Sequence, residues 1–174
     1  MGEIIEIRKK LTSLNYIQFI GSQTALGLLV ATAQFAIISI FEISLPSDRF
    51  EGHDYTFISY QPILMVSAVI ETLLFQYLPF IITRGVSLRK NFRPTKYILF
   101  SSVLFGLFHI IATQCMMPFA VIKVFFSTLS GVVLSVSFYI FRRKKQLPIL
   151  SVSLIHYLIN TLTLSAGVLL DLFG

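Results

Sequence analysis

Five long apolar stretches, separated by short polar segments, dominate the chain. They cover about residues 16–41, 57–83, 96–114, 118–141 and 147–173. A helix needs about 20 apolar residues to cross the hydrocarbon of a bilayer, and these stretches have the required length. Apolar and polar residues do not alternate in them with the period of two that barrel strands require. We therefore expect an all-α, polytopic membrane helix bundle with about five transmembrane helices.

The composition of the 174-residue chain agrees with this expectation. Hydrophobic residues make up 55% of the chain and charged residues only 13%, whereas an average soluble domain carries roughly 25% charge. A soluble globule of this size cannot bury so much apolar surface, and disordered chains are far less hydrophobic. We expect a single integral membrane domain over residues 1–174, with a motif-bearing core at about 57–173.

Lysine and arginine residues gather in three short clusters between the apolar stretches. Twelve of the fourteen lie in residues 8–10, 84–96 and 142–145. With five spans, these clusters fall on one side of the membrane, which the positive-inside rule assigns to the cytoplasm. The sequence thus predicts a cytoplasmic N-terminus and an external C-terminus, in a bacterial cytoplasmic membrane. The net charge of +6 is explained by this orientation and does not indicate nucleic-acid binding.

Small residues recur every four positions in the fourth stretch. Ser127, Gly131 and Ser135 share one helix face, and such a face allows a second helix to approach closely in the membrane. We expect it to pack against a neighbouring helix and assign it a structural role.

Four polar residues interrupt the apolar stretches at depth. Glu71 lies in the second stretch, His109 in the third, and His156 and Asn160 in the fifth. Counted along a helix from the nearest basic cluster, Glu71 and His109 lie roughly 20 Å deep and His156 roughly 17 Å deep. An ionisable group in hydrocarbon is costly unless it is paired or faces a cavity. The matching depths favour a functional cluster shared by three helices, although ordinary buried hydrogen bonds are the alternative.

Such a cluster is compatible with more than one chemistry. A carboxylate beside an imidazole can take a proton from water and return it to a leaving amine. A second imidazole and an amide can stabilise an oxyanion, so peptide hydrolysis needs no Ser or Cys nucleophile here. Glu71, His109 and His156 are also a possible ligand set for a divalent metal such as zinc, although the sequence has no HExxH helix. Two facing histidines are typical of haem proteins, but no other feature indicates haem.

At these residues the sequence resembles a known family, the CAAX-protease and bacteriocin-processing (CPBP, or Abi) membrane peptidases. The family has three motifs, Glu-Glu-x-x-x-Arg, Phe-x-x-x-His and His-x-x-x-Asn. They correspond, in the same order, to residues 71–76 (ETLLFQ), 105–109 (FGLFH) and 156–160 (HYLIN). The likeness extends over about residues 60–165.

The resemblance implies an intramembrane endopeptidase. Glu71 would activate water with the help of His109, His156 and Asn160 would form the oxyanion site, and Phe105 would be structural. The substrate would be a peptide or membrane protein in the lipid bilayer, such as a prenylated tail or a bacteriocin or pheromone leader. The family is often labelled metalloprotease, and the resemblance leaves the metal open.

The first motif departs from the family pattern at two positions. Thr72 replaces the second glutamate and Gln76 replaces the arginine. If only one of these two charged residues were replaced, the other would be a buried charge without a partner. The neutral pair present here is instead able to form a hydrogen bond. The departure also raises an alternative function, that of a non-catalytic CPBP-like immunity protein or membrane scaffold. Such a protein would act through a protein partner or as a homo-oligomer.

Overall fold

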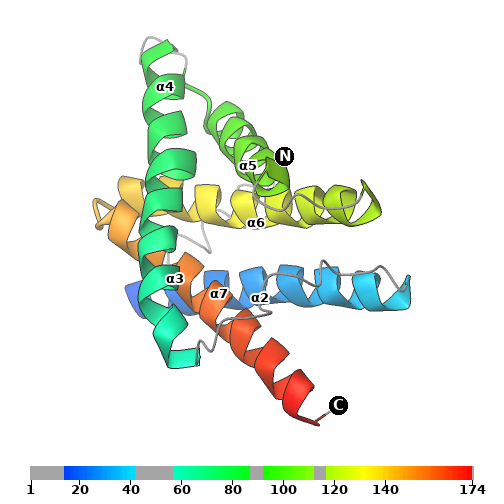
Figure 1. The fold of residues 1–174 in the computed structure, drawn as a ribbon. Helices are drawn as coiled ribbons and strands as arrows, with labels where there is room; N and C mark the ends of the chain where they lie inside the picture. Colours follow the sequence, from blue (N-terminus) through cyan, green and yellow to red (C-terminus); the bar gives the residue numbers. More distant parts are fainter. Residues whose placement is uncertain (1–13, 42–56, 87–91, 112–116, 174) are drawn as a thin grey trace.

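A computed structural model describes residues 14–41, 57–86, 92–111 and 117–173, and all secondary structure in these ranges is helical. The elements are α2 (Tyr16–Ile40), α3 (Phe57–Thr72), the π-helical turn η2 (Leu73–Tyr77), α4 (Leu78–Val86), α5 (Pro94–Ile111), α6 (Met117–Arg143) and α7 (Pro148–Phe173). Each predicted stretch corresponds to a helix. The second stretch forms one continuous rod made of α3, η2 and α4 (Figure 1). The all-α expectation is confirmed.

Four helices in these described ranges are long and apolar enough to cross a membrane. They are Tyr16–Ile40, Tyr60–Val86, Phe119–Arg143 and Pro148–Ser165. α5, in the place of the third stretch, has 18 residues and is thus about 27 Å long. The last predicted residues of that stretch, 112–114, lie outside the described ranges.

Helix α6 is the centre of the bundle. It packs against α2, α5, α7 and η2, and α3 packs against α7. In Figure 1, α2 and α6 run side by side in opposite directions, and α7 slants away from the end of α6. The α3–η2–α4 rod crosses this group, and α5 returns from the top of α4 to α6. The second, third and fifth predicted stretches, which carry the polar residues, thus gather around α6.

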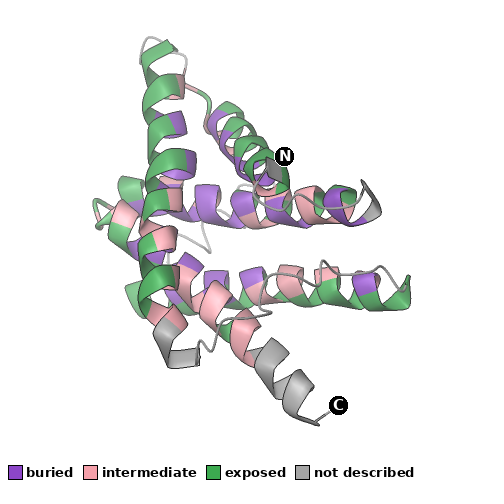
Figure 2. Ribbon diagram, viewed as in Figure 1, coloured by how far each residue is buried: buried purple, intermediate pink, exposed green. Residues whose placement is uncertain are grey.

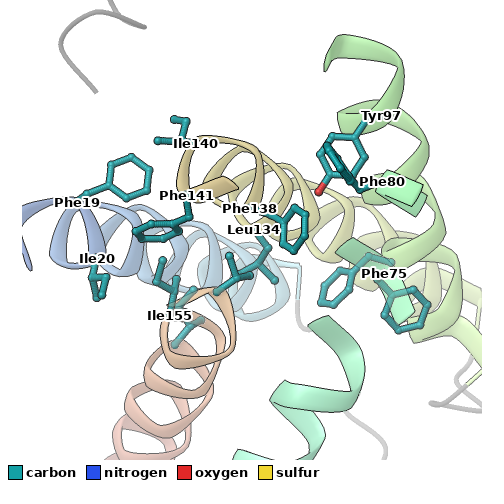
Figure 3. Close-up of a cluster of buried hydrophobic side chains, with 13 residues drawn as sticks. Phe19, Ile20, Phe75, Phe80, Tyr97, Leu134, Phe138, Ile140, Phe141 and Ile155 are labelled. Atoms are coloured by element: carbon teal, nitrogen blue, oxygen red, sulfur yellow. The ribbon is translucent and has the colours of Figure 1, made fainter. Parts of the chain in front are cut away.

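An aromatic cluster joins the rod to the rest of the bundle. Figure 3 shows Phe75 from η2, Phe80 from α4, Tyr97 from α5 and Phe138 from α6 within one buried group. The Phe80 ring centre lies 5.4 Å from that of Tyr97 and 5.7 Å from that of Phe138. Such tilted and edge-on contacts are the preferred geometries of aromatic pairs. They hold η2 in place beside α5 and α6.

The burial pattern is reversed relative to a soluble protein. Large aliphatic side chains face outward, among them Leu29 and Leu99 at 65% and 66% exposure, and green exposed surface covers the outer faces of the helices in Figure 2. Several serines are instead fully buried, namely Ser101, Ser102, Ser135, Ser137 and Ser151. Outward apolar side chains dissolve in lipid, while buried small hydroxyls permit close helix packing. The chain is an integral membrane protein.

The close approach of α5 and α6 depends on glycine. A Cβ at Gly131 would lie 2.9 Å from Ser102 Cα, and one at Gly106 would lie 2.9 Å from the Val124 carbonyl oxygen. The hydroxyl of Ser135 is 2.7 Å from that of Ser101 across the same interface. The predicted packing face at Gly131 and Ser135 is therefore confirmed.

Most of the described basic residues lie at one end of the bundle, whereas Lys123 lies near the opposite end of α6. Arg84 at the end of α4, Arg142 at the end of α6 and Lys145 in the following turn line one hollow. The Nζ of Lys144 donates a 2.8 Å hydrogen bond to the Leu14 carbonyl at the start of α2. This arrangement agrees with the predicted grouping of positive charge on one side. Residues 8–10 lie outside the described ranges, and the cytoplasmic location of this end stays a prediction.

Candidate active site

Glu71 lies near the end of α3, and its two carboxylate oxygens face different partners. The Ser67 hydroxyl, one turn earlier on the same helix, donates a 2.6 Å hydrogen bond to Glu71 Oε1. Glu71 Oε2 lies 3.6 Å from His156 Nε2 of α7. The side chains are 18% and 6% exposed respectively. The predicted meeting of an acid and an imidazole from distant segments is therefore present in the structure.

The π-helical turn that follows Glu71 has a local cause in the sequence. Pro79 has no N–H, so the Phe75 carbonyl four residues earlier lacks its usual helical donor. The Leu78 N–H bonds to the Leu73 carbonyl, five residues back, in place of the usual four. The Ser101 hydroxyl of α5 donates to the freed Phe75 carbonyl. The irregular turn thus provides an interhelical bond directly beside the acid, and such turns are frequent at functional sites.

Phe105 connects the two histidines of the predicted cluster. Its ring centre lies 4.5 Å from that of His109 and 5.6 Å from that of His156. Phe105 is itself 2% exposed, and Phe75 of η2 packs edge-on against it. The phenyl ring thereby fixes both imidazoles, which agrees with the structural role implied for Phe105.

The hydrogen bond of His109 determines which of its nitrogens is basic. Its Nδ1 lies 2.8 Å from the Phe105 carbonyl oxygen. Because a carbonyl only accepts, Nδ1 carries the proton and the neutral ring presents Nε2 as an acceptor.

Asn160 lies one turn beyond His156 on α7 and is half-buried. Its spacing of four residues places it on the same helix face as His156. In the described part of the chain its amide makes no hydrogen bond, so both its donor and acceptor groups are available to a ligand.

Thr72 and Gln76 do not form the hydrogen bond that their spacing allows. Both side chains are fully buried, and the Thr72 hydroxyl and both amide atoms of Gln76 lack a hydrogen-bond partner in the described ranges. The neutral pair is able to form a hydrogen bond by its chemistry, but in the described ranges it does not form one. The π-helical turn between these residues increases the number of residues per turn, which changes their relative direction from that in a regular α-helix.

An apolar hollow of about 510 Å³ opens beside Glu71. It runs along α3 and η2 and reaches Phe108 of α5, with Ile63, Val66, Ile70 and Leu74 among its apolar walls. Ser67 and Glu71 supply its polar groups. An elongated apolar group bound here would bring its polar end to the Glu71 carboxylate.

The donor set does not fit a three-ligand metal site. Within the described ranges, no three His, Cys, Asp or Glu side chains lie close enough together to hold one ion. Glu71 and His156 approach each other, and His109 packs against Phe105. Catalytic zinc needs three protein ligands and one open position. We therefore derive the chemistry of this site from protein groups alone.

Sequence reasoning missed two polar residues of α3 that support the site. Ser67 precedes Glu71 by four residues, and this helical spacing alone indicates that the two side chains meet. Gln61 Oε1 accepts hydrogen bonds from the Tyr157 and Thr161 hydroxyls, at 2.8 and 3.1 Å. These bonds fix α3 against α7 and hence Glu71 against His156. Only the fold identifies the partners of Gln61, because they lie about a hundred residues away.

Comparison with known proteins gives one match. A family model described as type II CAAX prenyl endopeptidase Rce1-like matches residues 55–162. This range includes Glu71, Phe105, His109, His156 and Asn160. No curated protein and no solved structure matches the chain.

Proposed function

We propose that this chain, which belongs to the Rce1-like family of type II CAAX prenyl endopeptidases, hydrolyses a peptide bond at the Glu71–His156 pair. The family model covers well over half of the chain, and the family consists of proteases of the CAAX type. The observation that carries the proposal is the 3.6 Å approach of Glu71 Oε2 to His156 Nε2. It supports an acid and an imidazole acting on one substrate.

Glu71 is the proposed general base. Its carboxylate takes a proton from water, and the resulting hydroxide attacks the carbonyl carbon of the scissile bond. The Ser67 hydroxyl holds Oε1, so Oε2 is the oxygen that meets the water. His109 presents an acceptor nitrogen and assists by accepting a hydrogen bond from the same water.

His156 and Asn160 are the proposed oxyanion site. An N–H of the imidazole and the amide of Asn160 donate to the carbonyl oxygen as negative charge develops on it. The separation of Glu71 and His156 supports this assignment, because the attacking water and the carbonyl oxygen must lie about 3 Å from their respective partners. When the tetrahedral intermediate collapses, protonated Glu71 gives its proton to the leaving amine, which balances the reaction.

The apolar hollow supports a substrate that brings an apolar group to Glu71. A prenylated tail satisfies this requirement, as does the unwound end of a transmembrane segment. The hollow is lined mainly by outward-facing side chains of α3 and η2, so such a substrate would reach it from the lipid phase. A bacteriocin or pheromone leader with an apolar segment is a further candidate of the same chemistry.

Glu71→Gln tests the proposal. Purified enzyme in lipid should lose cleavage of a prenylated or apolar reporter peptide by at least a factor of about 100, the usual contribution of general acid–base catalysis. Asp171→Asn, which removes the carboxylate of the fifth stretch, is the control and should retain cleavage. Full turnover by the Glu71→Gln enzyme contradicts the proposal.

A second candidate function is that of a non-catalytic immunity protein or scaffold. Thr72 and Gln76 favour it, because the polar groups of both side chains lack partners in the described ranges. In this case a strain that carries Glu71→Gln keeps its phenotype at normal protein level. Loss of the phenotype in that strain counts against this function and supports the peptidase.

A further inference from the structure

A second group of hollows lies at the basic end of the bundle, away from Glu71. One of about 450 Å³ is lined by Arg84, Arg142 and Lys145 together with the start of α7. Another of about 300 Å³ shares Arg84 and Arg142 and adds Arg143. The two arginines therefore belong to both hollows, although they come from helices more than fifty residues apart. The fold, and no local motif, brings Arg84 to the basic run at residues 142–145.

Within the described part of the chain, no acidic side chain balances the positive charge of these hollows. The residues that line them include no Asp or Glu. The Arg142 guanidinium stacks 5.0 Å from the centre of the Phe80 ring, which orients it but leaves its charge uncompensated. Cations concentrated in this way attract a compact anion, and arginine forks match the oxygens of phosphate.

The apolar residues that line the hollows indicate which kind of phosphate compound fits them. Leu147 and Pro148 line the first hollow, and Phe80 and Phe92 line the second. Leu147 is 70% exposed and neighbouring Leu150 on α7 is 58% exposed. Phosphate and apolar chains occur together in a phospholipid, whose headgroup lies where membrane helices end. A free phosphate ion would make no use of this apolar border.

We propose that Arg84, Arg142 and Lys145 bind the headgroup phosphate of an anionic phospholipid, with its acyl chains along Leu147 and Leu150. This lipid site is independent of the peptidase chemistry, because none of its residues contacts Glu71 or His156. It holds the α4 end and the α6–α7 turn together from outside.

Two substitutions remove charge from the site with little disturbance of the fold. Arg84→Gln changes an exposed residue, and Lys145→Asn changes a residue at φ 56°, a left-handed conformation that asparagine readily adopts. Arg142 is left intact, since it also packs on Phe80. The matched control is Arg93→Gln with Lys96→Gln, which removes the same charge from exposed positions that do not line either hollow.

Lipid retention measures the site directly. The full chain is extracted from vesicles of equal parts phosphatidylglycerol and phosphatidylcholine, and the bound lipid is counted by native mass spectrometry. We expect the wild-type chain to retain phosphatidylglycerol in preference, the R84Q/K145N protein to bind it about tenfold more weakly, and the R93Q/K96Q protein to match the wild type. If the double variant unfolds, the two single variants repeat the comparison.

Three results would overturn the proposal. Equal loss in R84Q/K145N and R93Q/K96Q would show general attraction to surface charge, and unchanged retention in R84Q/K145N would exclude these residues. Displacement of phosphatidylglycerol by inorganic phosphate, at a concentration where chloride has no effect, would assign the site to a free anion.

Discussion

At the scale of single residues, the candidate site consists of a carboxylate whose two oxygens have separate roles. Ser67 donates to Oε1, while Oε2 lies toward His156. A carboxylate held in this way keeps one orientation through the reaction, since its rotation would break the serine bond. Ser67 is therefore a positioning residue for Glu71, the proposed general base.

Ser67→Ala should lower kcat about tenfold or more, because a hydrogen bond to a charged group is worth roughly 1.5–3 kcal/mol. KM should change little, and Ser67→Thr should restore much of the rate. The measurement is steady-state cleavage of a reporter peptide. Ser22→Ala is the control, since that hydroxyl bonds only to a carbonyl of its own helix. An unchanged kcat in Ser67→Ala would show that Glu71 needs no such support.

At the scale of elements, the rod of α3, η2 and α4 contains the candidate site residue Glu71 and also forms a hydrogen bond to the neighbouring helix α5. Pro79 frees a carbonyl, η2 widens the turn, and Ser101 of α5 supplies the missing donor. Between α5 and α6, glycines allow the two helices to approach at backbone distance. The position of Phe105, and through it of both histidines, depends on these two contacts.

Ser101→Ala should lower the unfolding free energy by about 1–3 kcal/mol, because a buried carbonyl loses its donor. In the Pro79→Ala background the same substitution should cost less, since a backbone N–H at position 79 can bond to Phe75. Unfolding in mixed detergent measures this double-mutant cycle. Ser102→Ala, whose hydroxyl bonds only within α5, should have the same effect in both backgrounds. Additive losses for the Ser101 and Pro79 pair would contradict the interpretation.

Gly131→Ala should destabilise the bundle by about 1–3 kcal/mol, because the added Cβ would meet the backbone of Ser102. Gly21→Ala is the matched control in α2, where a Cβ has no neighbour within 4 Å. It should stabilise the chain by up to about 1 kcal/mol through helix propensity. The same unfolding measurement compares the two. Equal tolerance of both changes would mean that α5 and α6 can separate freely.

At the scale of the whole molecule, charge varies along the length of the bundle, and hydrophobicity varies from its outside to its interior. Basic side chains gather at one end, apolar side chains cover the outside, and hydroxyls lie within. The positive-inside rule assigns the basic end to the cytoplasm. The hollow beside Glu71 opens toward the lipid-facing side of α3 and η2, so the proposed substrate would enter it laterally from the lipid.

A reporter fused to the C-terminus tests the orientation. With five spans and a cytoplasmic basic end, alkaline phosphatase fused after residue 174 should be active, and green fluorescent protein at the same position should stay dark. Reporters inserted at residues 87–91 should give the reverse result. Fluorescence of the C-terminal fusion would mean that the topology is inverted or that the number of spans is even.

The sequence by itself determined the class of fold, the approximate helix positions and the polar residues at depth. These features follow from local composition, since each helix must supply about 20 apolar residues and must satisfy its own backbone. The three motifs also identified the family, which the match over residues 55–162 confirms.

The tertiary structure alone decided which polar groups meet. It pairs Glu71 with His156, places the Phe105 ring against both histidines, and leaves Thr72 and Gln76 without a mutual hydrogen bond. It also gathers Arg84 with Arg142. Depth along each helix can be counted from the sequence, but the rotation of one helix against another depends on side-chain packing and on the π-helical turn. Those contacts join residues far apart in the chain, and no local pattern encodes them.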